Sequence, residues 1–176
     1  MLSMLILVTP ELTHFIAGPE YYEAIWVVPP IAASLFFLFM SQLSINIEFY
    51  FGENTRLIKG SIISAVVNVV LNFICIPTLG YIAAGYTTLI AYLIFCATNY
   101  TCMKKICIKE FGEEKWKLYD IKFLMILSCI FLGAMVVMTL LYPFMVVRYT
   151  IIIVIMIVLF FKRKAIIEKI KEIRKV

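Results

Sequence analysis

Charged and titratable side chains are scarce in this sequence. Asp, Glu, Lys and Arg together make up 15% of the 176 residues, and there is a single histidine. A soluble domain has about 25% charged residues, so this chain has too little polar surface to cover itself in water. Hydrophobic residues make up 64% of the chain, and its mean hydropathy is +1.01. These values predict that lipid surrounds most of the chain.

Groupings typical of catalytic or metal sites are also missing from the sequence. The five cysteines are odd in number, and Cys102 and Cys107 have neither a second cysteine pair nor a histidine nearby, as a zinc site requires. We expect the cysteines to be small apolar filler. No nucleophile or acid–base pair is recognisable in the sequence. We expect a protein that is not an enzyme and that uses no metal or cofactor.

Long apolar runs are what the sequence does contain. A helix needs about 20 residues to cross the hydrocarbon core of a bilayer, and five runs reach or approach that length: 25–47, 57–76, 81–103, 123–141 and 144–161. A shorter run, 1–9, ends at Pro10 and is interpreted as the end of a spanning helix whose beginning is missing. We expect an all-α, polytopic transmembrane helix bundle with a loop over Pro10–Ala24.

The basic residues predict an orientation for this bundle. All of the 16 Lys and Arg residues except Arg148 fall on one side of an alternating topology with five full crossings. The positive-inside rule makes that side cytoplasmic, with the C-terminus inside. The net charge of +5 is then explained by topology, and nucleic-acid binding is not needed to account for it. We expect 104–122 to be a basic cytoplasmic connector, 123–161 two peripheral spans, and 162–176 a basic cytoplasmic tail.

Polar residues inside the second full span follow a helical period. Gly60, Ser64, Asn68 and Asn72 recur every fourth residue and therefore share one face. Such a stripe normally marks a helix–helix seam, and the alternative is a cavity wall whose amides bind sugar hydroxyls. Small residues in 81–103 predict that this segment packs closely against 57–76 as an antiparallel hairpin.

The first full span combines a proline pair with polar residues. Pro29 and Pro30 predict either a bend beside a cavity or the start of the helix. Gln42 and Asn46, in the inner half, are costly if they face lipid, so we expect them to face a partner helix or water. Glu48 is close enough to the cytoplasmic end to reach the interface.

Two fragments carry a resemblance to a known family: TPELTHFIAGPEYYEAIWVVPPIA and GENTRLIKGSIISAVVNVVLNFICIPTLGYIAAGYTTLIAYLI. They resemble the C-terminal lobe of bacterial polysaccharide (O-antigen-type) flippases of the multidrug/oligosaccharidyl-lipid/polysaccharide exporter superfamily. The resemblance covers about half of the chain, from Thr9 to Asn99, and 1–103 corresponds to the helices of that lobe. The features that carry it are Pro10-Glu11, Gly18 before Tyr21-Tyr22, Ala24, Thr55 to Ser61, Asn68 with Asn72, Pro77 with Gly80, and Ala83-Ala84-Gly85.

The resemblance implies a two-lobed transporter fold whose central cavity opens alternately to either side. Its substrate would be a polyprenyl-linked glycan, carried as the diphosphate from the inner to the outer leaflet of the inner (plasma) membrane for surface polysaccharide synthesis. The implied partners are that glycan, the lipid bilayer and the missing N-terminal lobe of the same transporter. The candidate substrate-binding residues are Asn68, Asn72, Gln42 and Asn46 for the sugar, and Arg56 and Lys59 for the diphosphate. A role as ordinary positive-inside anchors explains Arg56 and Lys59 better than diphosphate binding does.

Two other functions, and a non-functional remnant, are alternatives to the flippase interpretation of the sequence. A multidrug or small-solute antiporter of the same superfamily requires an ionisable residue deep in a span, and Glu48 is close to the interface for that role. A membrane-embedded glycan polymerase or transferase is expected to carry catalytic carboxylates or arginines on a long outside loop, whereas the outside loops here are short. A non-functional remnant is the third alternative.

Overall fold

The computed structural model describes residues 2–112, 121–155, 157 and 161, and of 54–57 it describes the backbone alone. This described part is helical and contains no strand. Its elements are α1 (Leu2–Ile16), the 3₁₀ helix η1 (Pro19–Trp26), α2 (Val28–Tyr50), α3 (Asn54–Leu79), α4 (Ala83–Phe111) and α5 (Ile121–Leu140). A further apolar helix covers Met145–Ile155. The chain divides into two compact units, Met1–Thr139 and Leu140–Val176.

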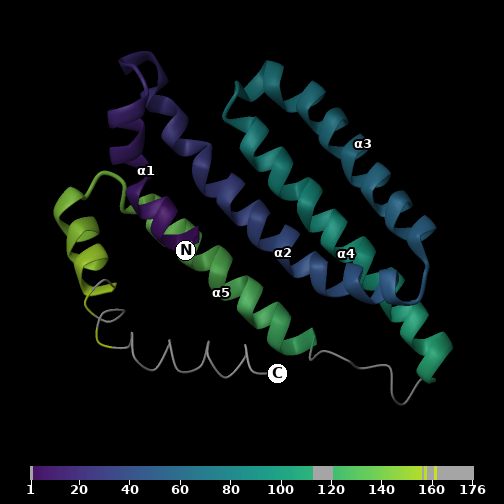
Figure 1. The fold of residues 1–176 in the computed structure, drawn as a ribbon. Helices are drawn as coiled ribbons and strands as arrows, with labels where there is room; N and C mark the ends of the chain where they lie inside the picture. Colours follow the sequence, from purple (N-terminus) through teal and green to yellow (C-terminus); the bar gives the residue numbers. More distant parts are fainter. Residues whose placement is uncertain (1, 113–120, 156, 158–160, 162–176) are drawn as a thin grey trace. The chain divides into compact units, whose positions relative to one another are not determined.

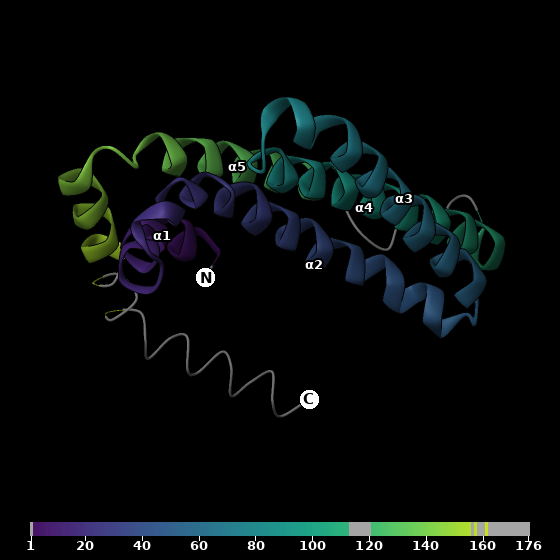
Figure 2. The same ribbon diagram turned by 90° about the horizontal axis from the view of Figure 1, so that it is seen from above.

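Within the first unit, α4 lies between α2 and α3 and packs along both (Figures 1 and 2). Three helical segments in the described part are long and apolar enough to cross a membrane: Val28–Tyr50, Ile58–Leu79 and Ile121–Leu140. α4 is not among them, although the sequence predicted a span over 81–103. Its Thr, Asn and Tyr residues lower its hydropathy. Several of these polar side chains donate hydrogen bonds to carbonyls of the preceding turn of α4 itself, as Thr88, Thr98 and Asn99 do.

The hairpin of α3 and α4 has the predicted antiparallel arrangement (Figure 1). α3 ends at Leu79, and Gly80 follows with a φ of 76°. This left-handed conformation favours glycine because a Cβ atom is strained there. The sequence predicted a tight turn over Pro77–Gly80 in which the proline ends the helix. Gly80 does end α3, but the helix runs through Pro77 to Leu79, so the predicted helix end at Pro77 is wrong.

Two other predicted boundaries are wrong. The loop expected over Pro10–Ala24 is instead the end of α1, which runs through Pro10 to Ile16, followed by η1. A proline removes a single backbone hydrogen bond, and the hydroxyl of Thr9 donates to the Leu5 carbonyl at 2.7 Å in the preceding turn. α4 likewise continues past the predicted end of the span at residue 103 and ends before Gly112.

Other predicted segments are described only in part. Residues 113–120 of the basic connector and the whole tail, 162–176, lie outside the described residues. The last predicted span, 144–161, appears as the helix Met145–Ile155, with most of its end outside the description. α5 matches the predicted span over 123–141 closely, and Met135 is its one buried residue.

The proline pair belongs to the start of α2 and not to a bend in its middle. Val28 is the first residue of the helix, and Pro29 and Pro30 follow it in the first turn, where the missing N–H groups have no intrahelical partner to lose. Both prolines are buried. They pack beside Gly85 of α4, where an added Cβ atom would lie 2.9 Å from Pro30 Cγ. The two helices therefore approach closely at their N-terminal ends.

Candidate functional site

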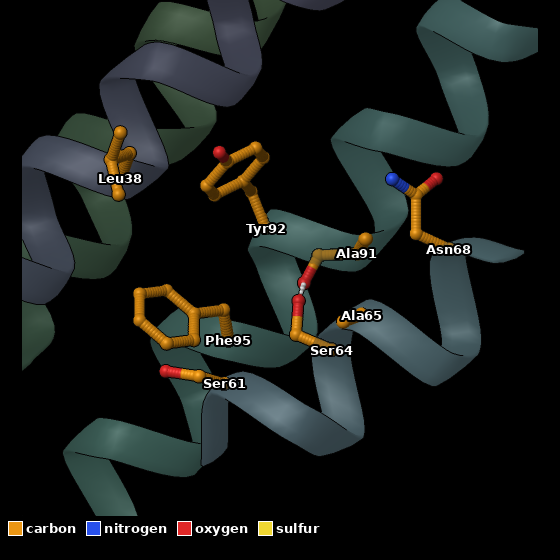
Figure 3. Close-up of a pocket in the computed structure, with 8 residues that line it drawn as sticks. All are labelled: Leu38, Ser61, Ser64, Ala65, Asn68, Ala91, Tyr92 and Phe95. Carbon is orange, nitrogen blue, oxygen red and sulfur yellow. Dashed lines mark hydrogen bonds between the residues drawn. The ribbon is translucent and has the colours of Figure 1, made fainter. Parts of the chain in front are cut away.

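A pocket of about 320 Å³ opens between α2, α3 and α4. Figure 3 shows that its walls combine small, hydroxyl, amide and aromatic side chains. The lining residues are Leu38 from α2, Ser61, Ser64, Ala65 and Asn68 from α3, and Ala91, Tyr92 and Phe95 from α4. Its volume lies at the lower end of the range of small-molecule sites, about 300–1,000 Å³.

The polar wall of this pocket is the predicted stripe of α3. Ser64 donates a hydrogen bond to the Ala91 carbonyl of α4 at 2.7 Å (Figure 3). Asn72 donates to Asn68 Oδ1 at 3.1 Å and accepts a hydrogen bond from the Thr87 hydroxyl of α4. The prediction that Asn68 and Asn72 face protein is therefore confirmed. The seam and the cavity wall, posed as alternatives by the sequence, occupy the same face.

Gly60 shows why the stripe begins with a glycine. A Cβ atom there would lie 3.3 Å from Thr98 Cγ2 and 3.4 Å from Asn99 Oδ1. These distances are tight for a Cβ atom, so a larger residue would push α3 away from α4. The close approach places the serine and asparagine side chains of the next turns within reach of α4.

The aromatic wall of the pocket comes from α4. The rings of Tyr92 and Phe95 are 6.3 Å apart and nearly perpendicular, with an interplanar angle of 87°. Both rings project into the space that faces Leu38 of α2 (Figure 3). An apolar ring face opposite hydroxyl and amide groups suits a ligand that has both a hydrogen-bonding edge and an apolar face, as a sugar ring does.

The structure does not bring the other predicted site residues into this pocket. Gln42 and Asn46 are exposed on α2 and are not among the pocket's lining residues. Lys59 is exposed on α3, and the Arg56 side chain lies outside the description. Of the six predicted residues, Asn68 lines the pocket. Asn72 donates a hydrogen bond to the Asn68 side chain and so helps to fix its position.

Sequence reasoning placed Glu48 wrongly. The side chain is fully buried, with 0% of its surface exposed, and does not reach water at the end of α2. Ser41 and Ser44 are buried on the same helix, and their spacing to Glu48 is that of one helix face. This spacing was the signal that could have identified Glu48 as an inward-facing residue.

Asn99 of α4 is a second buried polar residue that the sequence reasoning missed. Its side chain is 0% exposed and donates to the Phe95 carbonyl at 3.0 Å. Burying an amide is costly unless it is hydrogen-bonded, and this hydrogen bond offsets part of that cost. The local sequence pattern does not predict the burial of Asn99. The side chain is covered where Gly60 of α3 packs against it, and that contact joins two different helices.

In the second unit, Arg148 is also buried, with 1% of its surface exposed. The guanidinium donates to the Tyr142 carbonyl at 3.0 Å. This residue is the one basic side chain that the charge pattern placed outside. Its hydrogen bond to the carbonyl shows that it is part of a local turn structure.

The turn between α3 and α4 contacts η1 through one side-chain hydrogen bond. The Tyr81 hydroxyl donates to Glu23 Oε2 at 3.5 Å. Loss of surrounding water, the charge of the Glu23 carboxylate and this hydrogen bond together raise the pKa of Tyr81 above its ordinary value. The neutral phenol is therefore favoured at this position.

Comparisons with known proteins do not assign the chain to a family. No protein-family model, curated protein or solved structure matches it. The resemblance to polysaccharide flippases rests on the sequence fragments given above.

Proposed function

We propose that this chain is part of a membrane transporter that moves a polyprenyl-diphosphate-linked oligosaccharide from the inner to the outer leaflet. The observation that supports this proposal best is the pocket of hydroxyl, amide and aromatic groups between α2, α3 and α4. α2 and most of α3 are long and apolar enough to span a bilayer, so a polar-walled pocket between them faces the interior of the membrane. Transport requires no covalent chemistry, and the proposed protein is not an enzyme.

In this proposal, the pocket binds a sugar unit and the lipid tail remains in the bilayer. Asn68 and Ser61 offer hydrogen bonds to sugar hydroxyls, and Tyr92 offers a ring face. Gln42 and Asn46 are exposed polar groups on α2, and they contact the glycan or the N-terminal lobe of the transporter. Rocking of two lobes around a fixed site then changes the side to which the site opens.

The proposed location is the inner membrane, with several crossings and the C-terminus in the cytoplasm. Its support is the distribution of Lys and Arg along the sequence. Lys59, exposed near the cytoplasmic end of α3 in this orientation, is positioned to meet the diphosphate of the substrate.

A second candidate is a cation-coupled antiporter for small solutes, and one observation favours it. Glu48 is an ionisable side chain that is completely buried, as a residue that alternately binds a proton and a cation must be during part of its cycle. The two candidates differ in their response to Glu48→Gln. An antiporter loses its pH-dependent exchange, whereas glycan transport by the proposed pocket depends on Asn68 and Tyr92.

Complementation of a flippase-deficient bacterial strain tests the proposal. The chain is expressed alone and together with an N-terminal lobe of the flippase family, and surface polysaccharide is measured. We expect rescue only when both parts are present, because the mechanism needs two lobes. We expect Asn68→Leu to abolish this rescue, whereas Val69→Leu, at an exposed neighbouring position of α3, retains it. No rescue in either arrangement, with both proteins present in the membrane, contradicts the proposal.

A further inference from the structure

The Asn68 amide in the pocket between α2, α3 and α4 has a fixed hydrogen-bonding direction. The Thr87 hydroxyl donates to Asn72 Oδ1, and Asn72 Nδ2 donates to Asn68 Oδ1 at 3.1 Å. Because the Asn68 oxygen is turned toward Asn72, the NH₂ group of Asn68 is left for the pocket. Figure 3 shows this nitrogen on the side of Tyr92 and the oxygen on the far side. Among the described residues, the NH₂ group has no acceptor of its own.

Ser64 is the second polar group with a fixed role in this pocket. It lies one helical turn before Asn68 on the same face of α3. Its hydroxyl hydrogen is used in the hydrogen bond to the Ala91 carbonyl at 2.7 Å. A hydroxyl has one donor and two acceptor lone pairs, so Ser64 offers the pocket an acceptor only. The wall formed by α3 therefore presents a donor and an acceptor one turn apart.

The remaining walls disfavour a charged ligand. None of the described lining residues is Asp, Glu, Lys, Arg or His, and burying a charge without a partner is costly. The rings of Tyr92 and Phe95, 6.3 Å apart, add apolar surface beside the donor and the acceptor. The volume of about 320 Å³ is small for a ligand site, so the pocket suits one sugar unit of a longer glycan.

We propose that this pocket recognises the acetamido group of an N-acetylated amino sugar. The carbonyl and the N–H of such a group point to opposite sides. The carbonyl accepts a hydrogen bond from Asn68 Nδ2, the N–H donates to Ser64 Oγ, and the methyl group packs on the rings of Tyr92 and Phe95. A hydroxyl in the same place lacks the methyl group, and an ammonium offers no acceptor to Asn68. The proposal rests on the proposed function and names the class of sugar that the site selects.

Binding of three polyprenyl diphosphates to the purified full chain in detergent tests the proposal. Each ligand carries one sugar, N-acetylglucosamine, glucose or glucosamine, so the three differ only in an acetamido, hydroxyl or ammonium group at C2. Isothermal titration calorimetry measures the three dissociation constants. Asn68→Asp keeps the oxygen that accepts from Asn72 and replaces the donor with an acceptor, and Ser64→Ala removes the other partner. Val69→Leu, at an exposed position of α3, is the control, and circular dichroism establishes that each variant remains helical.

We expect the N-acetylglucosamine ligand to bind roughly twentyfold more tightly than the glucose ligand. One further hydrogen bond contributes about fivefold, and one buried methyl group contributes about fourfold. The glucosamine ligand binds most weakly, because its charge has no partner in the pocket. Asn68→Asp reverses the order, so that glucosamine is preferred to N-acetylglucosamine. Ser64→Ala lowers the preference for the acetamido group by about fivefold, and Val69→Leu leaves it unchanged.

Two results overturn the proposal and leave the proposed function standing. The first is equal binding of the N-acetylglucosamine and glucose ligands by the unaltered chain. The second is a helical Asn68→Asp variant that weakens all three ligands by the same factor, since that effect is structural. If the unaltered chain binds none of the three ligands, the proposed function itself is contradicted, and the proposal falls with it.

Discussion

Gly85 offers the sharpest test of how α2 and α4 pack. In Gly85→Ala, the new Cβ atom would lie 2.9 Å from Pro30 Cγ, 3.0 Å from the Val27 carbonyl oxygen and 3.2 Å from Val27 Cγ1. The proline ring is rigid, and the Val27 carbonyl accepts a hydrogen bond from the Ile31 amide at 3.3 Å. Neither neighbour can move without disturbing the first turn of α2, so the helices must separate.

The expected change in stability follows from two opposing contributions. Overpacking of this kind costs about 1–3 kcal/mol, while alanine is better than glycine inside a helix by about 1 kcal/mol. We expect Gly85→Ala to destabilise the protein by up to about 2 kcal/mol, or up to roughly 8 °C in Tm for a chain of this size. Gly133→Ala on α5 is the matched control, because no atom lies within 4 Å of its new Cβ.

Thermal unfolding in detergent micelles, followed by tryptophan fluorescence, measures both variants. Trp26 in η1 lies directly before the contact region, so its emission reports on the same end of the molecule. We expect Gly133→Ala to unfold at the same temperature as the unaltered chain or slightly above it. The packing argument is refuted if Gly85→Ala is as stable as Gly133→Ala.

Replacing Asn68 and Asn72 together with leucine removes one side-chain hydrogen bond within α3, from Asn72 to Asn68, and one across the α3–α4 seam, from Thr87 to Asn72. At about 0.6 kcal/mol per polar pair in a membrane, we expect a loss near 1 kcal/mol in unfolding experiments, and no loss refutes a structural role for the pair. Glu23→Gln should lower the pKa of Tyr81 toward its ordinary value, because a negative charge beside the phenol is removed. The absorbance difference between this variant and its Tyr81→Phe derivative measures the effect, and an unchanged pKa contradicts the contact. A thiol label at Pro19→Cys should react from outside intact cells while a reporter at the C-terminus stays inside, and the reverse result overturns the orientation.

The sequence predicted the helical class and the seam between α3 and α4 because both depend on local periodicity. The four-residue spacing from Gly60 to Asn72 is visible within one helix. The helix that packs against this face is α4, which is the next helix along the chain. The continuation of α1 through Pro10 was not predictable in this way, because a proline both begins and interrupts helices. Whether a helix continues through a proline depends on the residues that pack around it.

The site was predictable only in part for the same reason. Asn68 lines the pocket as the stripe suggested, but Tyr92 and Phe95 belong to it because α4 lies between α2 and α3. The exposure predicted for Glu48 is wrong because its position near the end of the span does not reveal that neighbouring residues cover its side chain. Burial is decided by packing between segments that are distant in the sequence. A pattern along one helix carries no information about that packing.

Transport by reconstituted protein tests the central proposal most directly. The chain and an N-terminal flippase lobe are placed in liposomes that contain a fluorescent polyprenyl-diphosphate oligosaccharide. A membrane-impermeant glycosidase then measures the fraction of glycan exposed on the outer face over time. We predict faster exchange between leaflets than in protein-free liposomes, and slower exchange with Asn68→Leu or Tyr92→Ala than with Val69→Leu. Exchange no faster than in protein-free liposomes, with both parts folded and inserted, contradicts the proposed function.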